Sequence, residues 1–161
     1  MRVSALLSAA AACLAPVTEA YIHTLGFPST IQVGVPFKVY YEQLISQPRV
    51  HNLIFGIQKD DGNIYKGEIG SSLFYSGYIK DVLPGGSFNG TLDPQFTIPT
   101  YFESGPAVIK VLLTEFAGLT NGVGFRTIYV PVTIGDATST ERSFGSIDDE
   151  NAESWVEAAS S

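Results

Sequence analysis

The stretch Phe125-Arg126-Thr127-Ile128-Tyr129-Val130-Pro131-Val132-Thr133-Ile134 decides the fold class. Its aliphatic residues Ile128, Val130, Val132 and Ile134 occur at every second position, which is the period of a strand that buries one face. Phe125, Thr127 and Tyr129 therefore belong to the opposite, outward face. Pro131 has no backbone N–H to donate, so it marks this strand as a sheet edge, where a partner's strand could be added.

The rest of residues 21–134 repeats this pattern in short apolar runs separated by Gly, Pro, Asn and Asp, without helical spacing. The pattern predicts strands at residues 22–25, 37–43, 52–59, 64–68, 73–79, 87–97, 107–116 and 125–134. Asp60-Asp61-Gly62-Asn63 and Asn121-Gly122 are turn sequences, because Asp, Asn and Gly tolerate the backbone angles of tight turns. We expect an all-β protein, an immunoglobulin-like β-sandwich of seven to eight antiparallel strands, with a closed barrel as the alternative.

In an immunoglobulin-like sandwich the strands at residues 52–59, 107–116 and 125–134 are neighbours, in the positions called C, F and G. Alternation directs one set of their residues into the core: Leu53, Phe55, Ile57, Ile109, Val111 and Leu113. It places Ile54 and Leu112 outward, on the same face as Phe125, Thr127 and Tyr129. We predict that these five residues form a partner-binding patch. The alternative is that a loop or the C-terminal tail covers part of it.

Tyr129 is the expected anchor of this patch. Tyrosine combines a large apolar ring with a hydroxyl and loses little rotamer entropy on binding. Replacing an outward Tyr129 by alanine is expected to leave the fold intact and to weaken partner binding.

The first twenty residues have the layout of a secretory signal peptide. Met1-Arg2 is positively charged, residues 3–14 are apolar but too few to span a bilayer, and Thr18 and Ala20 fit a small-x-small cleavage site. Cleavage would start the mature chain at Tyr21 and remove Cys13, the only cysteine, so no disulfide is expected. A buried N-terminal helix is the alternative. We expect a secreted monomer without membrane insertion.

Charge divides the chain near residue 135. The 161 residues include 9 Lys and Arg against 16 Asp and Glu, a net charge of −7. Residues 135–161 hold seven of the acidic residues against Arg142 alone, with few large apolar side chains, a composition typical of disorder. We expect a sandwich domain at residues 21–134 and an acidic, mostly disordered tail at residues 135–161. Within this tail, Ser146-Ile147-Asp148-Asp149 resembles the start of a short helix. Deleting the tail should shift the melting temperature by only a few degrees.

Few side chains of the mature chain suit catalysis or metal binding. His23 and His51 are the only histidines, and without cysteine they do not make a metal cage. A copper site of the kind found in oxidative polysaccharide-cleaving enzymes needs histidine as the first residue, whereas His23 would be third. No Gly-x-Ser-x-Gly elbow is present, and the adjacent Asp60 and Asp61 are explained by their turn. We expect no catalytic residue, no metal, no cofactor and no enzymatic activity.

Two features concern carbohydrate. Asn89-Gly90-Thr91 is an N-glycosylation sequon in a Gly-rich stretch. A row of three exposed rings drawn from Tyr40, Tyr65, Tyr75, Tyr78 and Tyr101 would favour a carbohydrate or cell-wall binding module, which is the alternative to protein binding. Nucleic acid and anionic membranes are poor candidate partners, because an acidic chain with nine basic residues cannot neutralise many phosphates.

Three segments carry a family resemblance: Tyr21-Ile22-His23-Thr24-Leu25-Gly26-Phe27-Pro28, Val33-Gly34-Val35-Pro36-Phe37 and Thr127-Ile128-Tyr129-Val130-Pro131-Val132. With the signal peptide and the lack of mature cysteines, they make the chain similar to the necrosis-inducing secreted effectors of fungi over residues 21–134. The resemblance brings no catalytic residues. It implies a protein that binds plant immune receptor-like kinases and their cytoplasmic relay kinases, suppresses pattern-triggered immunity and can induce cell death. The implied place of action is the host apoplast, the host plasma membrane or the host cell interior.

Overall fold

The computed structural model describes residues 20–45, 49–63, 68–83, 88–117, 122–147 and 153–156. Its strands are β1 (Ala20–Pro28), β2 (Thr30–Gln32), β3 (Tyr40–Ile45), β4 (Arg49–Lys59), β5 (Ser72–Tyr78), β6 (Asn89–Thr91), β7 (Gly105–Ala117), β8 (Gly122–Gly135), β9 (Arg142–Ser146) and β10 (Glu153–Val156). One turn of 3-10 helix, η1 (Ile79–Asp81), follows β5. In this part of the chain no helix has the length and apolar character needed to cross a membrane.

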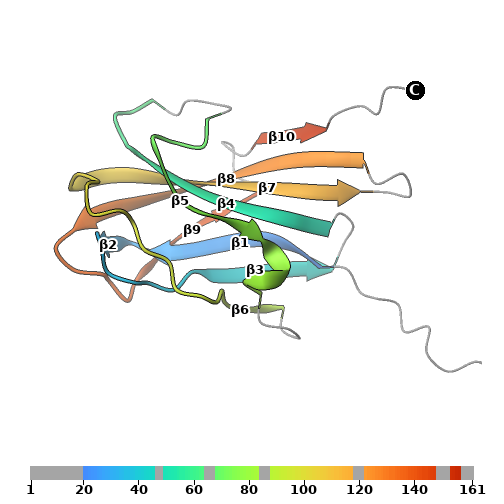
Figure 1. Ribbon diagram of the computed structural model, residues 1–161, viewed down its shortest axis with the longest axis horizontal. Helices are drawn as coiled ribbons and strands as arrows, with labels where there is room; N and C mark the ends of the chain where they lie inside the picture. Colours follow the sequence, from blue (N-terminus) through green and yellow to red (C-terminus); the bar gives the residue numbers. More distant parts are fainter. Residues whose placement is uncertain are drawn as a thin grey trace, which may run out of the picture.

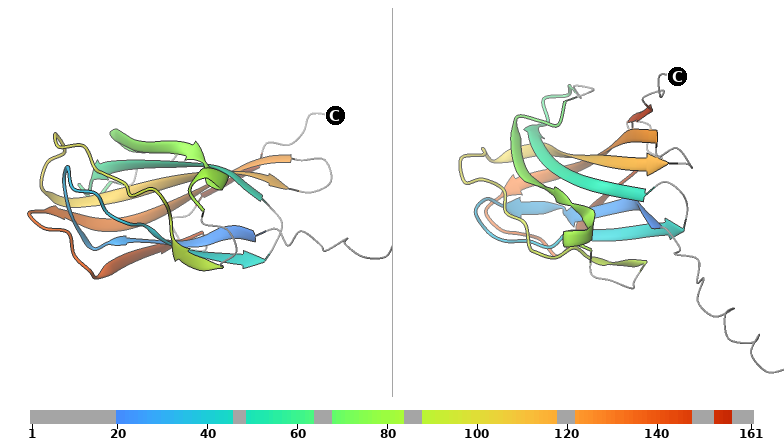
Figure 2. Two further views of the ribbon diagram at one scale, coloured as in Figure 1. Left: turned by 60° about the horizontal axis from the view of Figure 1, so that its bottom comes forward. Right: turned by 45° about the vertical axis from the view of Figure 1, so that its right-hand side comes forward.

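The strands form two sheets that pack face to face, as Figures 1 and 2 show. The first sheet has the order β6-β3-β1-β9 and the second has the order β10-β8-β7-β4-β5, with antiparallel neighbours in both. β2 adds to the second sheet by lying parallel to the end of β8. The predicted sandwich is confirmed, with β4, β7 and β8 in the C, F and G positions. The closed-barrel alternative is wrong.

The chain crosses from the first sheet to the second at Ser29. Pro28 ends β1 opposite Arg142 of β9. The Ser29 N–H donates to the Glu141 carbonyl at 2.8 Å, and the Ser29 carbonyl accepts from the Thr133 N–H at 2.8 Å. This residue is therefore hydrogen-bonded on both sides, and it directs β2 against the edge of β8.

The core lies between the facing sides of the two sheets. Its centre is the ring of Phe55 on β4, whose centroid is 5.4 Å from that of Phe27 on β1, 5.6 Å from Phe74 on β5 and 5.0 Å from Phe96. The inward residues predicted from alternation are buried: Leu53, Phe55, Ile57, Ile109, Val111, Leu113, Ile128, Val130, Val132 and Ile134. The period-two analysis of β4, β7 and β8 is confirmed.

Other predicted elements differ from the structure. The strand predicted at residues 87–97 is reduced to β6 and an isolated bridge between Phe37 and Phe96. Most of the strand predicted at residues 64–68 lies outside the described residues, as does Asn121 of the second predicted turn. The first turn is confirmed, because Asp60 Oδ1 accepts from the Gly62 N–H at 3.1 Å, and Gly62 has a φ of 82°.

The C-terminal segment contributes strands to both sheets. β9 pairs with β1 from Thr24 to Pro28, and β10 pairs with β8 from Gly124 to Thr127. The prediction of a mostly disordered tail is therefore wrong over both strands. The short helix is wrong at β10, whereas Asp148 and Asp149 at its predicted start lie outside the described residues. The physical reason is that open strand edges offer backbone partners, so a segment with few apolar residues becomes ordered by hydrogen bonds.

We predict that two truncations distinguish the contribution of β9 to stability from that of the residues after it. A chain ending at Gly135 loses β9 and Ile147, which packs against the core. Its melting temperature should fall by about 10 °C or more, because several kcal/mol are lost at about 3 °C each. A chain ending at Ile147 keeps β9 and should melt within a few degrees of the full chain. Thermal unfolding followed by circular dichroism tests this, and equal melting temperatures for the two truncations would contradict the role given to β9.

Candidate functional site

The outward face of the second sheet is built from alternate residues of β4, β7 and β8. The strand pairings arrange these residues in three cross-strand rows: Asn52-Thr114-Phe125, Ile54-Leu112-Thr127 and Gly56-Lys110-Tyr129. All five residues of the predicted patch belong to these rows, and the strand neighbours of Ile54, Leu112 and Tyr129 are core residues named above. Their shared orientation follows from this register, whereas their role in binding stays a prediction.

Part of this face is covered. Tyr129 is 6% exposed, Thr127 is equally buried and Lys110 is fully buried, with its ammonium 5.6 Å from the centre of the Tyr129 ring. In the same row a side chain at Gly56 would collide with the backbone carbonyl of Ile69, so the chain between β4 and β5 crosses the sheet there. The expected exposure of Thr127 and Tyr129 is wrong, and the alternative that part of the patch is covered is confirmed. We call Gly56, Lys110, Thr127 and Tyr129 the covered half.

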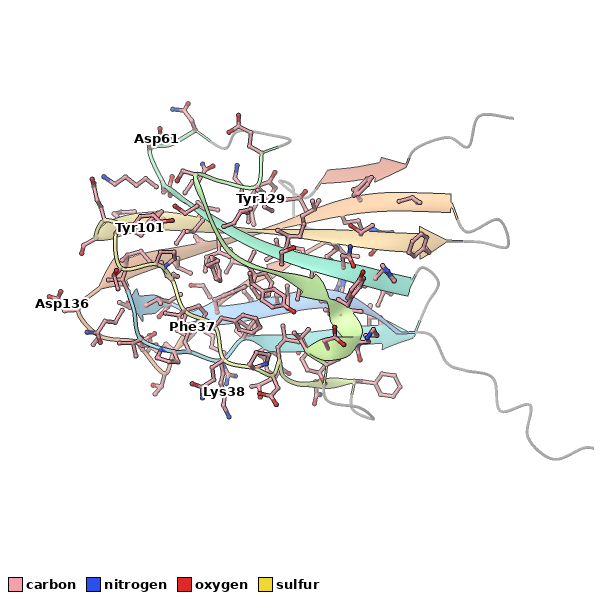
Figure 3. The ribbon with its side chains drawn as sticks, in the orientation of Figure 1. Phe37, Lys38, Asp61, Tyr101, Tyr129 and Asp136 are labelled. Carbon is pink, nitrogen blue, oxygen red and sulfur yellow. The ribbon has the colours of Figure 1, made fainter. Side chains whose placement is uncertain are left out.

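Figure 3 shows Tyr129 over the second sheet and Phe37 in the space between the sheets. Phe37 is 3% exposed and packs against Phe27 and Phe74, so it belongs to the core. The two rings are therefore buried on opposite sides of the second sheet. Replacement of Tyr129 by alanine is now expected to cost stability by removing a buried ring.

The remainder of the outward face is accessible. Ile54, Leu112 and Phe125 are half-buried, and three ring residues that the sequence analysis did not place in the patch extend it: Tyr78, which is 49% exposed, His51 and Phe116. The His51 ring lies 5.2 Å from the Tyr78 ring and 5.1 Å from the Phe116 ring, in edge-on contacts with both. We call these six residues the open half.

Two signals in the sequence point to the added residues. Phe116 continues the outward alternation of Leu112 and Thr114 along β7. Tyr78 is opposite Asn52 in the pairing of β5 with β4, which requires knowledge of the register. No signal identifies His51, because it lies at an irregularity between Val50 and Asn52 in the pairing of β4 with β7.

The exposed edge of the open half carries opposite charges. Lys80 Nζ donates to Asp81 Oδ1 at 2.8 Å and lies 5.6 Å from the centre of the Tyr78 ring. The hydrogen bond to Asp81 and its negative charge raise the pKa of Lys80. The ammonium therefore remains charged beside an exposed ring, an arrangement suited to a partner surface with both apolar and polar groups.

A partly buried ion pair lies on the inward side of the same sheet. Arg126 Nε donates to Glu115 Oε2 at 2.7 Å, and the Arg126 guanidinium lies over the ring of Tyr21 on β1 at 5.9 Å. Glu115 is 2% exposed, and its Oε1 is buried without a hydrogen-bond partner among the described residues. Burial raises the pKa of Glu115, and the charge and hydrogen bond of Arg126 oppose that rise.

The outer edge of β8 is occupied at both ends by the chain itself. β2 pairs with it from Thr133 to Gly135, and β10 pairs with it from Gly124 to Thr127. Pro131 lies between these two pairings. Strand addition by a partner at this edge stays a prediction, and the structure leaves it only the short stretch between β2 and β10.

The tyrosines proposed for carbohydrate stacking are dispersed. Tyr40 is on β3 of the first sheet, Tyr78 is on β5 of the second, and Tyr101 lies in the loop before β7 (Figure 3). Tyr75 faces the core, with its ring 5.4 Å from Phe55 and 5.0 Å from Phe96. Tyr65 lies outside the described residues. The four described rings make no flat row.

Other places offer little chemistry. A polar cleft of about 290 Å³ beside the covered half is lined by Gln58, Lys59, Asp61, Glu68, Gly70 and Ser71. Asp61 Oδ1 already accepts from the Asn63 N–H at 3.0 Å, and the Lys59 ammonium pairs with Glu103. No group of three His, Cys, Asp or Glu side chains in the described ranges could hold a metal ion. His23 is on β1 and His51 on β4, so the histidines belong to different sheets.

We predict that the Glu115 ion pair gives stability an unusual pH dependence. A folded-state pKa above the ordinary value of 4.5 means that the folded chain binds this proton more tightly than the unfolded chain does. The contribution of Glu115 is then fully present below the unfolded pKa and is lost as pH rises through the folded pKa. Glu115→Gln should therefore gain stability relative to wild type as pH rises from the unfolded-state pKa of Glu115 through its folded-state pKa. Urea unfolding at a series of pH values measures this difference.

Glu103→Gln is the control, because Lys59 lowers the pKa of this exposed carboxyl. Its contribution is lost as pH falls, so the variant should show a small change of the opposite sign, reduced by solvent screening. A stability difference between Glu115→Gln and wild type that is constant with pH would contradict the raised pKa.

Comparison with known proteins supplies the family. No curated protein matches the chain. The sequence model of the Nis1 family matches residues 18–133, which include β1 to β7 and nearly all of β8. Because this match covers well over half of the sequence, the chain belongs to the Nis1 family of fungal effectors.

Proposed function

We propose that this effector is secreted, has no enzymatic activity and binds host plant proteins through the open half of the second sheet. By resemblance, the partners are immune receptor-like kinases and their cytoplasmic relay kinases, and binding suppresses pattern-triggered immunity and can induce cell death. The observation that carries the proposal is an accessible cluster of ring and aliphatic side chains on a rigid sheet: Ile54, Leu112, Phe125, His51, Tyr78 and Phe116.

The physical support is the combination of apolar area and rigidity. Aromatic residues dominate binding hot spots because they bury large area with few rotatable bonds. The His51 ring contacts the rings of Tyr78 and Phe116, and the strands beneath them are fixed by the core. Little ordering entropy is therefore lost when a partner covers this surface.

The alternative, a carbohydrate-binding module, has weaker support. Sugar stacking needs coplanar exposed rings, whereas Tyr40, Tyr78 and Tyr101 lie on the first sheet, the second sheet and a loop. An enzymatic function has support from neither the polar cleft nor the histidines described above. Protein binding is the function that the geometry favours.

Tyr78→Ala tests the proposal directly. The side chain is half exposed on an edge strand, so its removal should cost little stability. It should weaken binding to a purified host receptor-like kinase, in its extracellular or kinase domain, by about 2 kcal/mol, which is about 30-fold in Kd. Isothermal titration calorimetry, with a melting curve for each variant, gives both quantities.

Tyr101→Ala is the matched control, because it removes the same exposed side chain from a loop outside the open half. Its affinity should equal that of wild type. Tyr129→Ala should instead lower stability by about 2–4 kcal/mol while the folded fraction still binds. Equal affinities for Tyr78→Ala and Tyr101→Ala would rule out the open half as the interface.

A further inference from the structure

The outward face of the first sheet carries an exposed aromatic pair. Tyr40 on β3 and Phe144 on β9 lie on either side of Gly26 on β1 in one cross-strand row. Their ring centroids are 6.0 Å apart in an edge-on contact, and a side chain at Gly26 would collide with the Phe144 ring. Phe144 is 51% exposed. This pair is a second accessible apolar surface, on the opposite side of the molecule from the open half.

Polar groups surround this pair. The Arg142 guanidinium lies over the Tyr40 ring at 5.1 Å, and the Tyr40 hydroxyl donates to Glu42 Oε1 at 3.2 Å. The surface thus combines ring faces with hydrogen-bonding groups, which is the chemistry that recognises a sugar: apolar C–H faces pack on rings, and hydroxyls bond to charged side chains.

The glycosylation sequon lies on the same face. β6 consists of Asn89, Gly90 and Thr91, and it is the edge strand beside β3. A side chain at Gly90 would meet the buried ring of Tyr41 at 3.4 Å, so Gly90 faces the core. By alternation Asn89 and Thr91 face outward, and Asn89 is exposed.

The register places the asparagine close to the aromatic pair. Asn89 is opposite Glu42, and Thr91 is opposite Tyr40. Tyr40 is therefore a diagonal neighbour of Asn89, at about 7–8 Å between backbones, within reach of long side chains. Phe144 lies three strand spacings from β6, a distance of about 15 Å.

We propose that Asn89 carries an N-linked glycan that lies along the outward face of the first sheet, over Glu42, Tyr40 and Phe144. The first sugars meet Glu42 and Tyr40, and later sugars of the core extend toward Phe144. The glycan covers the exposed rings and blocks the open edge of β6 against pairing with other chains. It leaves the open half of the second sheet as the surface for host proteins. This inference rests on the secretion included in the proposed function.

The experiment compares wild type with Thr91→Ala, both secreted with the full chain by a eukaryotic host that attaches N-glycans. Thr91→Ala removes the sequon and keeps Asn89. Intact mass before and after enzymatic removal of N-glycans should show a glycan on wild type only, and the treated wild type should carry Asp at position 89. Fluorescence of a dye that binds exposed apolar surface should rise several-fold in Thr91→Ala, and Phe144→Ser added to that variant should reverse the rise.

A secreted wild-type protein with unmodified Asn89 would overturn the proposal, as would a glycan whose removal leaves dye fluorescence unchanged. Asn89→Gln should reproduce the rise, which separates loss of the glycan from any effect of Thr91 itself. Failure of the protein to reach the medium would instead contradict the secretion in the proposed function.

A Tyr78→Ala defect in host-protein binding that is equal in glycosylated and Thr91→Ala backgrounds supports the separation of the two faces. A host-protein affinity that depends on the glycan would contradict that separation.

Discussion

Aromatic rings packed around Phe55 hold the two sheets together. Immunoglobulin domains of antibodies connect their sheets with a disulfide, whereas the described residues of this chain contain no cysteine. Phe55 on β4 contacts Phe27 of the opposite sheet, and Phe74 and Phe96 surround the same ring. Ring packing is thus the cross-connection, and replacement by alanine at such a site costs about 3–5 kcal/mol.

The next residue, Gly56, has the opposite orientation and lies on the outward face. Its lack of a side chain lets the backbone of Ile69 cross directly over the sheet. Lys110 and Tyr129 of the same row are also buried, while the rows toward His51 stay accessible. The candidate interface therefore lies on the rows away from this close approach. A glycine has a similar effect in the first sheet. Because Gly26 has no side chain, the Phe144 ring lies over β1 beside Tyr40.

The alternation of apolar and polar residues along a strand predicts which of its side chains face the core and which face outward. The inward residues of β4, β7 and β8 and the orientation of Ile54, Leu112 and Phe125 were predicted from the period-two pattern. The order of these strands was predicted from the immunoglobulin-like arrangement. The burial of Tyr129 was not, because alternation gives the orientation of a side chain and not what lies over it. β9 was missed because Arg142-Ser143-Phe144-Gly145-Ser146 has one large apolar residue and is ordered by its pairing with β1. The relation of Asn89 to Tyr40 likewise exists only through the register of β6 with β3.

The rate of thiol labelling is a direct test of the division of the outward face into a covered and an open half. A chain that begins at Tyr21 has no cysteine, so Phe125→Cys and Tyr129→Cys each introduce a single thiol. We predict that the thiol at position 125 reacts with a soluble maleimide nearly as fast as that of the exposed Tyr101→Cys. The thiol at position 129 should react many-fold more slowly, because labelling requires the cover to open. Equal labelling rates at positions 125 and 129 in folded protein would show that position 129 is not covered.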